Sequence, residues 1–349
     1  MILLREIQEK DLEALERFAQ IPGLINLPND RELLQEKIKK SIQSFYTRGG
    51  DFRRESKFIF VAEDLSSGRV VGTSMVAAQH GTAESPHFYF EVGSEKKFSE
   101  TISTGFIHGT LQLKFDSDGP SEIGGLVMDP DFRNTEAKVG RQISFIRFLF
   151  MGLNRGKFKK KIISELLPPL NKRGQSPLWE AIGRRFTNMD YWEADALCQK
   201  NKEFIFSLFP AEKIYTTFLP AEARNAIGKV GKETEPVVHM LQKIGFKYPN
   251  QVDPFDGGPH FWVDVEEIVP IKKLAKFKWD LNLSQKDSYA NDKGLVCKTV
   301  QASGCFRAVS AHVILSKDRG LSFLSPEASQ VEAVLGLNPG DDLDFMPFY

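Results

Sequence analysis

The stretch Ile123-Gly-Gly-Leu-Val-Met-Asp-Pro-Asp-Phe-Arg133 decides the fold of this chain of 349 residues. Its first six residues are apolar or glycine, which indicates a buried strand. Pro130 has no N–H for a sheet, so we expect strand pairing to end there in a turn. A helix follows in which apolar residues recur at alternating spacings of four and three: Val139, Ile143, Ile146, Phe150 and Leu153. The stretch therefore predicts a strand, a turn, a loop and a deeply buried helix.

This order of elements suits the binding of a coenzyme that carries a diphosphate. Where a strand stops pairing, its backbone N–H groups can polarise the carbonyl of a thioester; Leu126, Val127 and Met128 are the candidates. An ordinary buried strand with a type I turn is the alternative. The N-terminus of the next helix favours anions. The candidates for holding the diphosphate of coenzyme A are Arg133, Lys138, Gly140 and Arg141. The pattern favours acyl transfer over hydrolase, kinase or redox chemistry.

Composition limits the class of protein. Lys plus Arg equals Asp plus Glu at 46 each, which argues against nucleic acid or an anionic membrane as the main partner. The three cysteines are too few for a disulfide framework. No Cys-x-x-Cys pair occurs and the six histidines are scattered, so we expect no metal site. The N-terminus becomes charged too early for a signal peptide, and we expect a cytoplasmic protein.

The hydrophobic pattern predicts an α+β fold with a mixed, mostly antiparallel sheet flanked by helices. Residues Phe58–Ala62 and Val70–Val76 are expected to form an antiparallel hairpin, and Lys161–Glu165 a strand. Ser176 is expected to cap a helix. After about residue 271, short strands with turns, one of them at Ser303-Gly304, predict a small β-rich domain. The expected domains are 1–270, which could divide into halves 1–190 and 191–270, and 271–349.

Several short motifs, in order along nearly the whole chain, resemble the arginine N-succinyltransferase family of the acyl-CoA N-acyltransferase fold group. They are Leu126–Arg133, Gly174–Trp179, Gly183–Phe186, Met189-Asp190, Ala194-Asp195, Ile214-Tyr215, Phe218-Leu219 and Phe255–Pro259. The resemblance implies transfer of a succinyl group from succinyl-CoA to the α-amine of arginine, and some relatives accept ornithine. It also implies a C-terminal β-barrel-like domain, a succinyl-CoA contact at Leu126, and a homo- or hetero-oligomer.

The sequence departs from the family pattern at four places. The family's proton-donating histidine follows an Ile-Gly-x-Val pattern, but Ile227-Gly-Lys-Val230 is followed here by Gly231. Leu167 and Glu91 each replace a family arginine. The loop from Asn134 to Gly140 is about two residues longer than the family's glycine-rich phosphate loop. Three of these changes fall where substrate, coenzyme or proton transfer would be handled.

Four further residues are candidates for the acceptor side of the site. Glu165, at the end of a strand, could act as a base or pair with a guanidinium. His239 could replace the missing acid or base, although it could equally be an ordinary helix histidine. Asp256 and Glu91 could bind a cationic substrate. The alternatives are an Asx-turn for Asp256 and an exposed strand position for Glu91.

Three functions stay open from the sequence. The first is direct attack of the arginine amine on succinyl-CoA in a ternary complex. The second is a divergent N-acyltransferase that uses another amine or acyl group. The third is a non-catalytic protein that binds acyl-CoA or serves as a subunit of an assembly.

Overall fold

The computed structural model describes residues 1–21, 27, 29–47, 49–133, 135–171, 173–198, 201–283, 290–298, 306–324 and 326–349. The chain divides into two compact units built from interleaved segments. Unit 1 contains residues 1–78, 123–160 and 264–349, and unit 2 contains residues 79–122 and 161–263. The turn predicted at Ser303-Gly304 and the loop residue Asn134 lie outside the described residues.

Unit 1 is built around a sheet whose strands follow the order β6-β3-β2-β1-β13-β12-β15-β11-β14. The hairpin predicted from the sequence is confirmed, because β2 and β3 pair antiparallel from Lys57 opposite Ala77 to Asp64 opposite Arg69. The strands on the N-terminal side of the sheet are β1 (Ile2–Glu6), β2 (Lys57–Asp64), β3 (Arg69–Ala77) and β6 (Ser121–Met128). The boundary between the units falls within β6, after Glu122.

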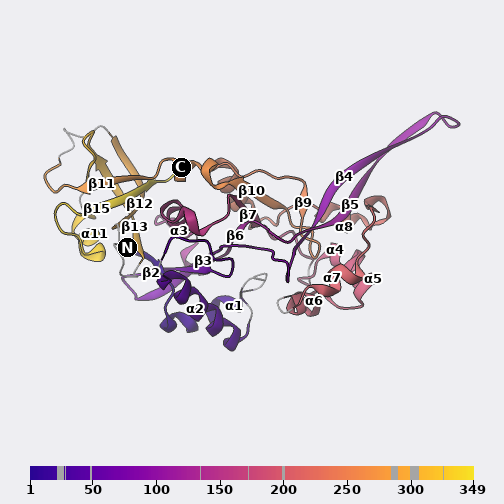
Figure 1. Cartoon of the computed structure of the whole chain (residues 1–349), viewed down its shortest axis with the longest axis horizontal. Helices are drawn as coiled ribbons and strands as arrows, with labels where there is room; N and C mark the ends of the chain where they lie inside the picture. Colours follow the sequence, from indigo (N-terminus) through magenta and orange to yellow (C-terminus); the bar gives the residue numbers. More distant parts are fainter. Residues whose placement is uncertain are drawn as a thin grey trace. The chain divides into compact units, whose positions relative to one another are not determined.

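Helices cover both faces of this sheet (Figure 1). On one face, Ile59 and Val61 of β2 pack in one apolar cluster with residues of α1 and α2. On the other, Phe58 and Phe60 contact Phe150 of α3. The helices are α1 (Leu12–Ala19), α2 (Arg31–Tyr46), α3 (Val139–Leu153) and the short α10 (Val269–Lys272). Alternating strand residues therefore supply both apolar layers.

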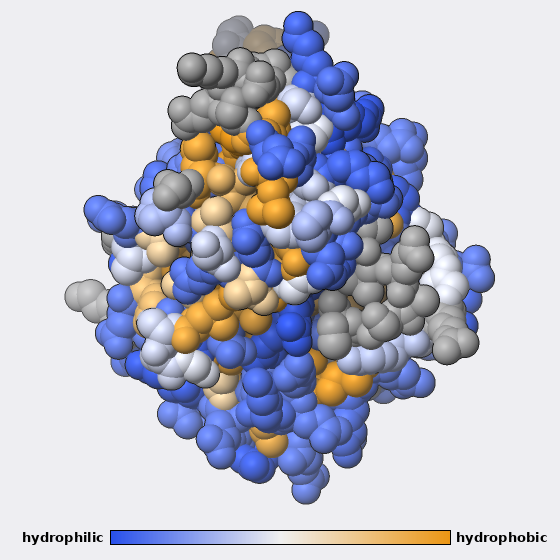
Figure 2. All heavy atoms as spheres, turned by 90° about the vertical axis from the view of Figure 1, so that its left-hand side faces the viewer, coloured by the Kyte–Doolittle hydropathy of each residue, from blue (hydrophilic) through white to orange (hydrophobic). Residues whose placement is uncertain are grey.

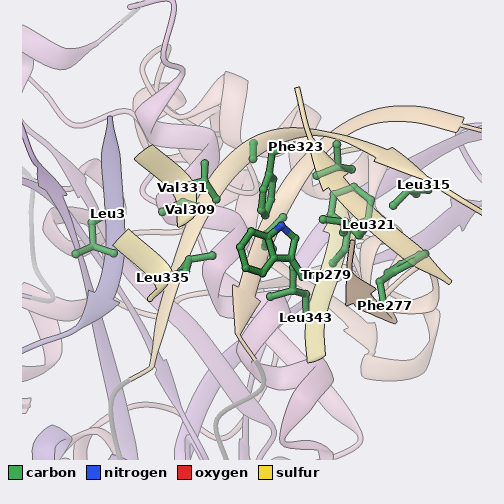
Figure 3. Packing of buried hydrophobic residues seen from close by; sticks show 14 residues of the cluster. Leu3, Phe277, Trp279, Val309, Leu315, Leu321, Phe323, Val331, Leu335 and Leu343 are labelled. Atoms are coloured by element: carbon green, nitrogen blue, oxygen red, sulfur yellow. The ribbon is translucent and has the colours of Figure 1, made fainter. Parts of the chain in front are cut away.

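The C-terminal strands close into a small barrel. β13 pairs with both β12 and β14, and β11 joins β14 to β15, so the five strands form a ring. They are β11 (Ala275–Trp279), β12 (Ala290–Lys298), β13 (Arg307–Leu315), β14 (Gly320–Phe323) and β15 (Asp342–Pro347), with α11 (Ala328–Leu335) beside them. Trp279 lies at the centre of the core (Figure 3). Seen from the barrel side, hydrophilic side chains cover most of the surface, with apolar patches between them (Figure 2).

Unit 2 contains a second sheet in the order β8-β5-β4-β9. Its long hairpin, β4 (His87–Ser99) and β5 (Thr104–Asp116), extends well beyond the rest of the unit (Figure 1). β8 (Ile214–Tyr215) and β9 (Gln251–Val252) are short edge strands. Beside them, β7 (Lys161–Glu165) lies between β10 (His260–Asp264) and the start of β6, to which it runs parallel.

Short helices complete unit 2. Ser176 caps the first of them as expected, because its hydroxyl accepts a hydrogen bond from the backbone N–H of Trp179 at 3.0 Å. Trp179 is fully buried and stacks on Phe255 of a later loop. The helices are α4 (Pro177–Ala181), α5 (Gly183–Thr187), α6 (Tyr191–Cys198), α7 (Glu203–Leu208), α8 (Ala221–Ala226) and α9 (Glu235–Lys243).

The α+β class, the mixed and mostly antiparallel sheet and the C-terminal barrel are confirmed. The compact units interleave along the chain. The contiguous domains 1–270 and 271–349 expected from the sequence stay a prediction. Among the described residues, none of the helices combines the length and apolar character that crossing a bilayer requires.

Candidate active site

The strand predicted to contact a thioester is irregular in the structure. Gly125 has φ +55°, and a Cβ there would lie only 3.0 Å from Cγ of Met75, so the strand carries a local distortion that suits glycine. Beyond it, Val127 is buried, while Leu126 and Met128 are half-buried on the other face. In the described residues, β6 pairs with β7 only through Ser121 and Glu122.

The loop after β6 leads into α3 as the sequence predicts. Lys138 is the N-cap in a left-handed conformation, and Gly140 lies in the first turn, where an added Cβ would be 3.3 Å from Cε of Met128. The helix start and the strand end are therefore in contact. The side chains of Arg133 and Lys138 are exposed. Arg141 instead donates to the main-chain oxygen of Tyr349 and lies over the ring of Phe348, 4.6 Å from its centroid.

Within unit 2, three separate segments meet at the end of β7. The N–H of Gly231 donates to the oxygen of Leu167 at 3.2 Å. The N–H of Gly228 donates to the oxygen of Gly257 at 2.8 Å, and the N–H of Leu166 to the oxygen of Pro259 at 3.2 Å. The strand end, the segment 227–231 and the loop 253–259 are thus held together by backbone hydrogen bonds.

The loop 253–259 is shaped by its own carboxylates. Oδ1 of Asp253 accepts from the N–H groups of Phe255 and Asp256, and Oδ1 of Asp256 accepts from the N–H of Gly258 at 2.7 Å. The Asx-turn left open for Asp256 by the sequence is therefore present. Burial, with the charge of Glu165 nearby, raises the pKa of Asp253 to about 7, and burial with the charge of Asp253 raises the pKa of Asp256 well above its usual value.

Glu165, the last residue of β7, is surrounded by three imidazoles. Its Oε1 lies 3.1 Å from Nε2 of His87, 3.4 Å from Nε2 of His80 and 3.7 Å from Nε2 of His260. The His87 ring lies between the other two rings, with centroids 4.7 Å from His80 and 5.2 Å from His260. We call His80, His87, Glu165 and His260 the histidine–carboxylate cluster. All four residues belong to unit 2.

The three imidazoles differ in charge. Burial lowers the pKa of His87 and lowers that of His260 to about 3, so both rings are neutral at neutral pH. Burial also disfavours the charged form of His80, but Glu122 and Glu165 outweigh it and raise the pKa of His80. Nδ1 of His80 lies 2.9 Å from Oε2 of Glu122. Burial opposes ionisation of Glu165 too, yet the neighbouring histidines hold its pKa well below the usual range. In this cluster His80 is therefore the imidazole that holds a proton most readily, and the neutral rings of His87 and His260 can offer lone pairs.

Comparison with known proteins identifies the family. The family model "Arginine N-succinyltransferase beta subunit" matches residues 2–270. The chain is 35% identical over 276 residues to an arginine N-succinyltransferase of Citrobacter koseri, covering 78% of this chain and 79% of the relative. It is 34% identical, with the same coverage, to that of Shigella dysenteriae serotype 1. The chain belongs to the arginine N-succinyltransferase family.

A solved structure agrees with this assignment. The arginine/ornithine succinyltransferase subunit AI of Pseudomonas aeruginosa matches with a TM-score of 0.82 and 25% sequence identity, covering 100% of this chain and 99% of that one. The acyltransferase fold expected from the sequence is therefore confirmed over the whole chain.

The structure shows where the departures from the arginine N-succinyltransferase pattern at Gly231 and Glu91 lie, and where His239 lies. Gly231, the position at which the resemblance implies the family's histidine, donates its backbone N–H to Leu167, two residues after Glu165. Glu165 of the cluster and Leu167, to which Gly231 is bonded, therefore lie at the same strand end. Glu91 is exposed on β4 and His239 is exposed on α9, and the structure brings neither of them into the cluster.

Sequence reasoning found Glu165 but missed the histidines around it. Spacing marks neither His80 nor His87, and from the sequence His260 was interpreted as an ordinary structural histidine. The one available signal was the position of His260 directly after the Asp-Gly-Gly-Pro turn. Only the assembled strands bring residues so far apart in sequence to one carboxylate oxygen.

Proposed function

We propose that this chain transfers the succinyl group of succinyl-CoA to the α-amine of L-arginine, by direct attack of the amine in a ternary complex. The support is the family match over residues 2–270 and the names of the relatives. One structural observation carries it further. Phe255–Pro259, which resembles the family, converges through backbone hydrogen bonds with Glu165–Leu167 and 227–231, the two segments that hold the departures at Leu167 and Gly231.

On the coenzyme side, the backbone N–H groups of Leu126, Val127 and Met128 would polarise the thioester carbonyl. The diphosphate would lie at the N-terminus of α3, where unpaired N–H groups and the helix dipole favour anions. Arg133 and Lys138 have exposed side chains there. Arg141 is the weakest of the predicted contacts, because the C-terminal residues of the chain already engage its guanidinium.

On the acceptor side, the amine must lose a proton before it attacks the carbonyl carbon. A tetrahedral intermediate then collapses, the C–S bond breaks, and the leaving thiolate takes up the proton that the attacking nitrogen gives up, so the coenzyme leaves as its thiol. Gly231 has no side chain that could take the proton. We assign this role to the cluster, and to Glu165 first, because it lies on the strand end to which Gly231 is bonded. Binding of the arginine side chain by Glu91 and Asp256 stays part of the proposal.

The test is release of free thiol from succinyl-CoA in the presence of L-arginine, with the product identified by mass. Ornithine, lysine and other amines form the comparison panel, with acetyl-CoA as the alternative donor. Thiol release that depends on arginine supports the proposal. Faster turnover with another amine or donor favours the divergent enzyme. Coenzyme binding without turnover on any pair contradicts catalysis and favours a binding subunit.

A designed variant sharpens the test. A Cβ at Gly231 would meet only ordinary contacts, with Pro168 O at 3.6 Å, so a side chain fits at its base. If the proposed substrates are right, Gly231→His should raise arginine-dependent turnover by about tenfold or more, because general acid–base groups contribute at least that much. Gly231→Ala is the matched control and should give no gain. Equal rates for both variants would argue against arginine succinylation at this site.

A further inference from the structure

The spacing of the histidine–carboxylate cluster is that of ligands around one metal ion. Zn²⁺ binds imidazole nitrogen and carboxylate oxygen at about 2.0–2.2 Å, which places neighbouring ligands of a tetrahedron roughly 3.3–3.5 Å apart. Oε1 of Glu165 lies 3.4 and 3.1 Å from Nε2 of His80 and His87, and 3.7 Å from Nε2 of His260. The ligand atoms of His80, His87 and Glu165 all lie within 4.8 Å of one another.

The hydrogen bonding of the cluster is incomplete without a further group. Neither ring nitrogen of His260 has a hydrogen-bond partner, although the residue is 0% exposed. Nε2 of His87, which is 3% exposed, has no partner other than the carboxylate oxygen of Glu165 at 3.1 Å. Unpaired buried polar atoms are costly, so they point to a partner that binds between them.

The surroundings of His80 match those of a metal-bound histidine. Its Nδ1 lies 2.9 Å from a carboxylate oxygen of Glu122, while its Nε2 faces Glu165. Histidines that bind metals almost always use one ring nitrogen for the ion and the other for a carboxylate or carbonyl, which fixes the ring. Glu122 therefore orients His80 toward the centre of the cluster.

The charge around the cluster also favours a cation. Glu122 and Asp256 are buried carboxylates, and a carboxylate oxygen of Asp253 lies within 4.8 Å of the ligand oxygen of Glu165 and of a ring nitrogen of His260. An ion of charge +2 would offset the mutual repulsion of these acids. Lys202 already contributes a single positive charge that acts on His80 and Asp253.

We propose that His80, His87 and Glu165 bind one divalent transition-metal ion of the Zn²⁺ class, with His260 as the fourth ligand. Imidazole and carboxylate are ligands that Zn²⁺ accepts in tetrahedral geometry. Each imidazole supplies the lone pair of Nε2, the carboxylate supplies one oxygen, and any proton on Nε2 of His80 leaves to solvent. This site goes beyond the proposed function and was not expected from the scattered histidines of the sequence.

The test is Zn²⁺ binding to the full chain, prepared with a chelator and measured by competition with a chromophoric chelator without succinyl-CoA or arginine. One ion should bind per chain, and Co²⁺ should give the visible absorption of a tetrahedral site. His87→Ala should weaken binding by at least about 100-fold and abolish the Co²⁺ spectrum. His108→Ala, on the neighbouring strand β5, is the matched control and should bind as the wild type does.

Glu122→Gln keeps the test decisive if His87→Ala fails to fold. This variant leaves every proposed ligand in place and should weaken binding about 10–100-fold, the usual effect of removing a partner behind a metal-bound histidine. Binding no tighter than that of a His80→Ala/His87→Ala double variant would overturn the proposal, as would equal affinity for wild type and both single variants. Since substrates are absent, such a result leaves the proposed acyl transfer untouched, and absence of thiol release leaves the metal site untouched.

Discussion

Gly258→Ala should damage the candidate site through the backbone alone. A Cβ at this position would lie 2.1 Å from the oxygen of Leu166, 2.9 Å from Oδ1 of Asp256 and 3.0 Å from Cδ of Pro168. Ordinary contact begins at 3.4 Å, so the loop and the strand end would have to separate by more than 1 Å. The nearest of these groups is a backbone oxygen and another is a proline ring carbon, neither of which can swing aside, and the third, the carboxylate of Asp256, is held by the N–H of Gly258.

The expected loss of stability follows from what this movement breaks. Overpacking costs about 1–3 kcal/mol. The movement also strains the hydrogen bonds from Gly258 N to Asp256, from Asp253 N to Gly258 O and from Leu166 N to Pro259 O. Each is worth about 0.5–1.5 kcal/mol. We therefore expect Gly258→Ala to lower the free energy of unfolding by about 2–5 kcal/mol.

Urea unfolding followed by tryptophan fluorescence is the assay, because three of the four tryptophans, Trp179, Trp192 and Trp262, belong to unit 2. Gly231→Ala is the control. It lies in a bonded segment of the same site, but its Cβ would meet nothing closer than 3.6 Å, so we expect a change within about 0.5–1 kcal/mol. Equal unfolding curves for the two variants would refute the steric reasoning, and with it the close contact of loop and strand.

Three further predictions concern other groups. Arg5→Met should cost about 3–5 kcal/mol in urea unfolding, because it leaves the buried carboxylate of Asp11 with the N–H of Gln8 but without its two hydrogen bonds from Arg5. Arg31→Met at the exposed pair with Glu16 should change little, and similar losses for the two variants would contradict this. Burial raises the pKa of Asp195 to about 6. The contribution of this shift to the free energy of unfolding is therefore fully present below the unfolded pKa of about 4 and is lost as the pH rises through 6. Asp195→Asn should therefore exceed the wild type in stability by about 1–3 kcal/mol at pH 7 and match it near pH 4, and a gap that does not vary with pH would exclude this cause. Because the proposed proton acceptor and the proposed metal ligands are the same atoms, saturating Zn²⁺ should slow thiol release by at least about tenfold and a chelator should restore it; an unchanged rate with the ion demonstrably bound would show that the amine proton goes elsewhere.

The sequence predicts those parts of the fold in which burial follows a regular period. The spacing from Val139 to Leu153 predicts α3, and Phe145, Phe148 and Leu149 on its remaining faces are fully buried as expected. The hairpin of β2 and β3 and the barrel strands follow from apolar runs between turn residues. The outer half of β4 follows no such pattern, because it carries exposed residues such as Phe98 and is held by pairing with β5.

The site was predictable only in part, since no local pattern marks a contact between distant segments. Glu165 could be named because it ends an apolar strand. His80, His87 and His260 precede or begin different strands, and their rings meet only after β4, β7 and β10 have assembled. The interleaving of the two units was hidden for the same reason, because it depends on contacts between segments that are distant in the sequence.

The pairing of Leu3 with Val309 sets an order for biosynthesis. Strand β1 leaves the ribosome well before β13 and has no partner on its β13 side until Arg307–Leu315 have been translated. The residues of unit 2, by contrast, are all present once Val263 has emerged. A nascent chain therefore holds an open strand edge until β13 has emerged, and a chain truncated before Arg307 would leave that edge exposed for good.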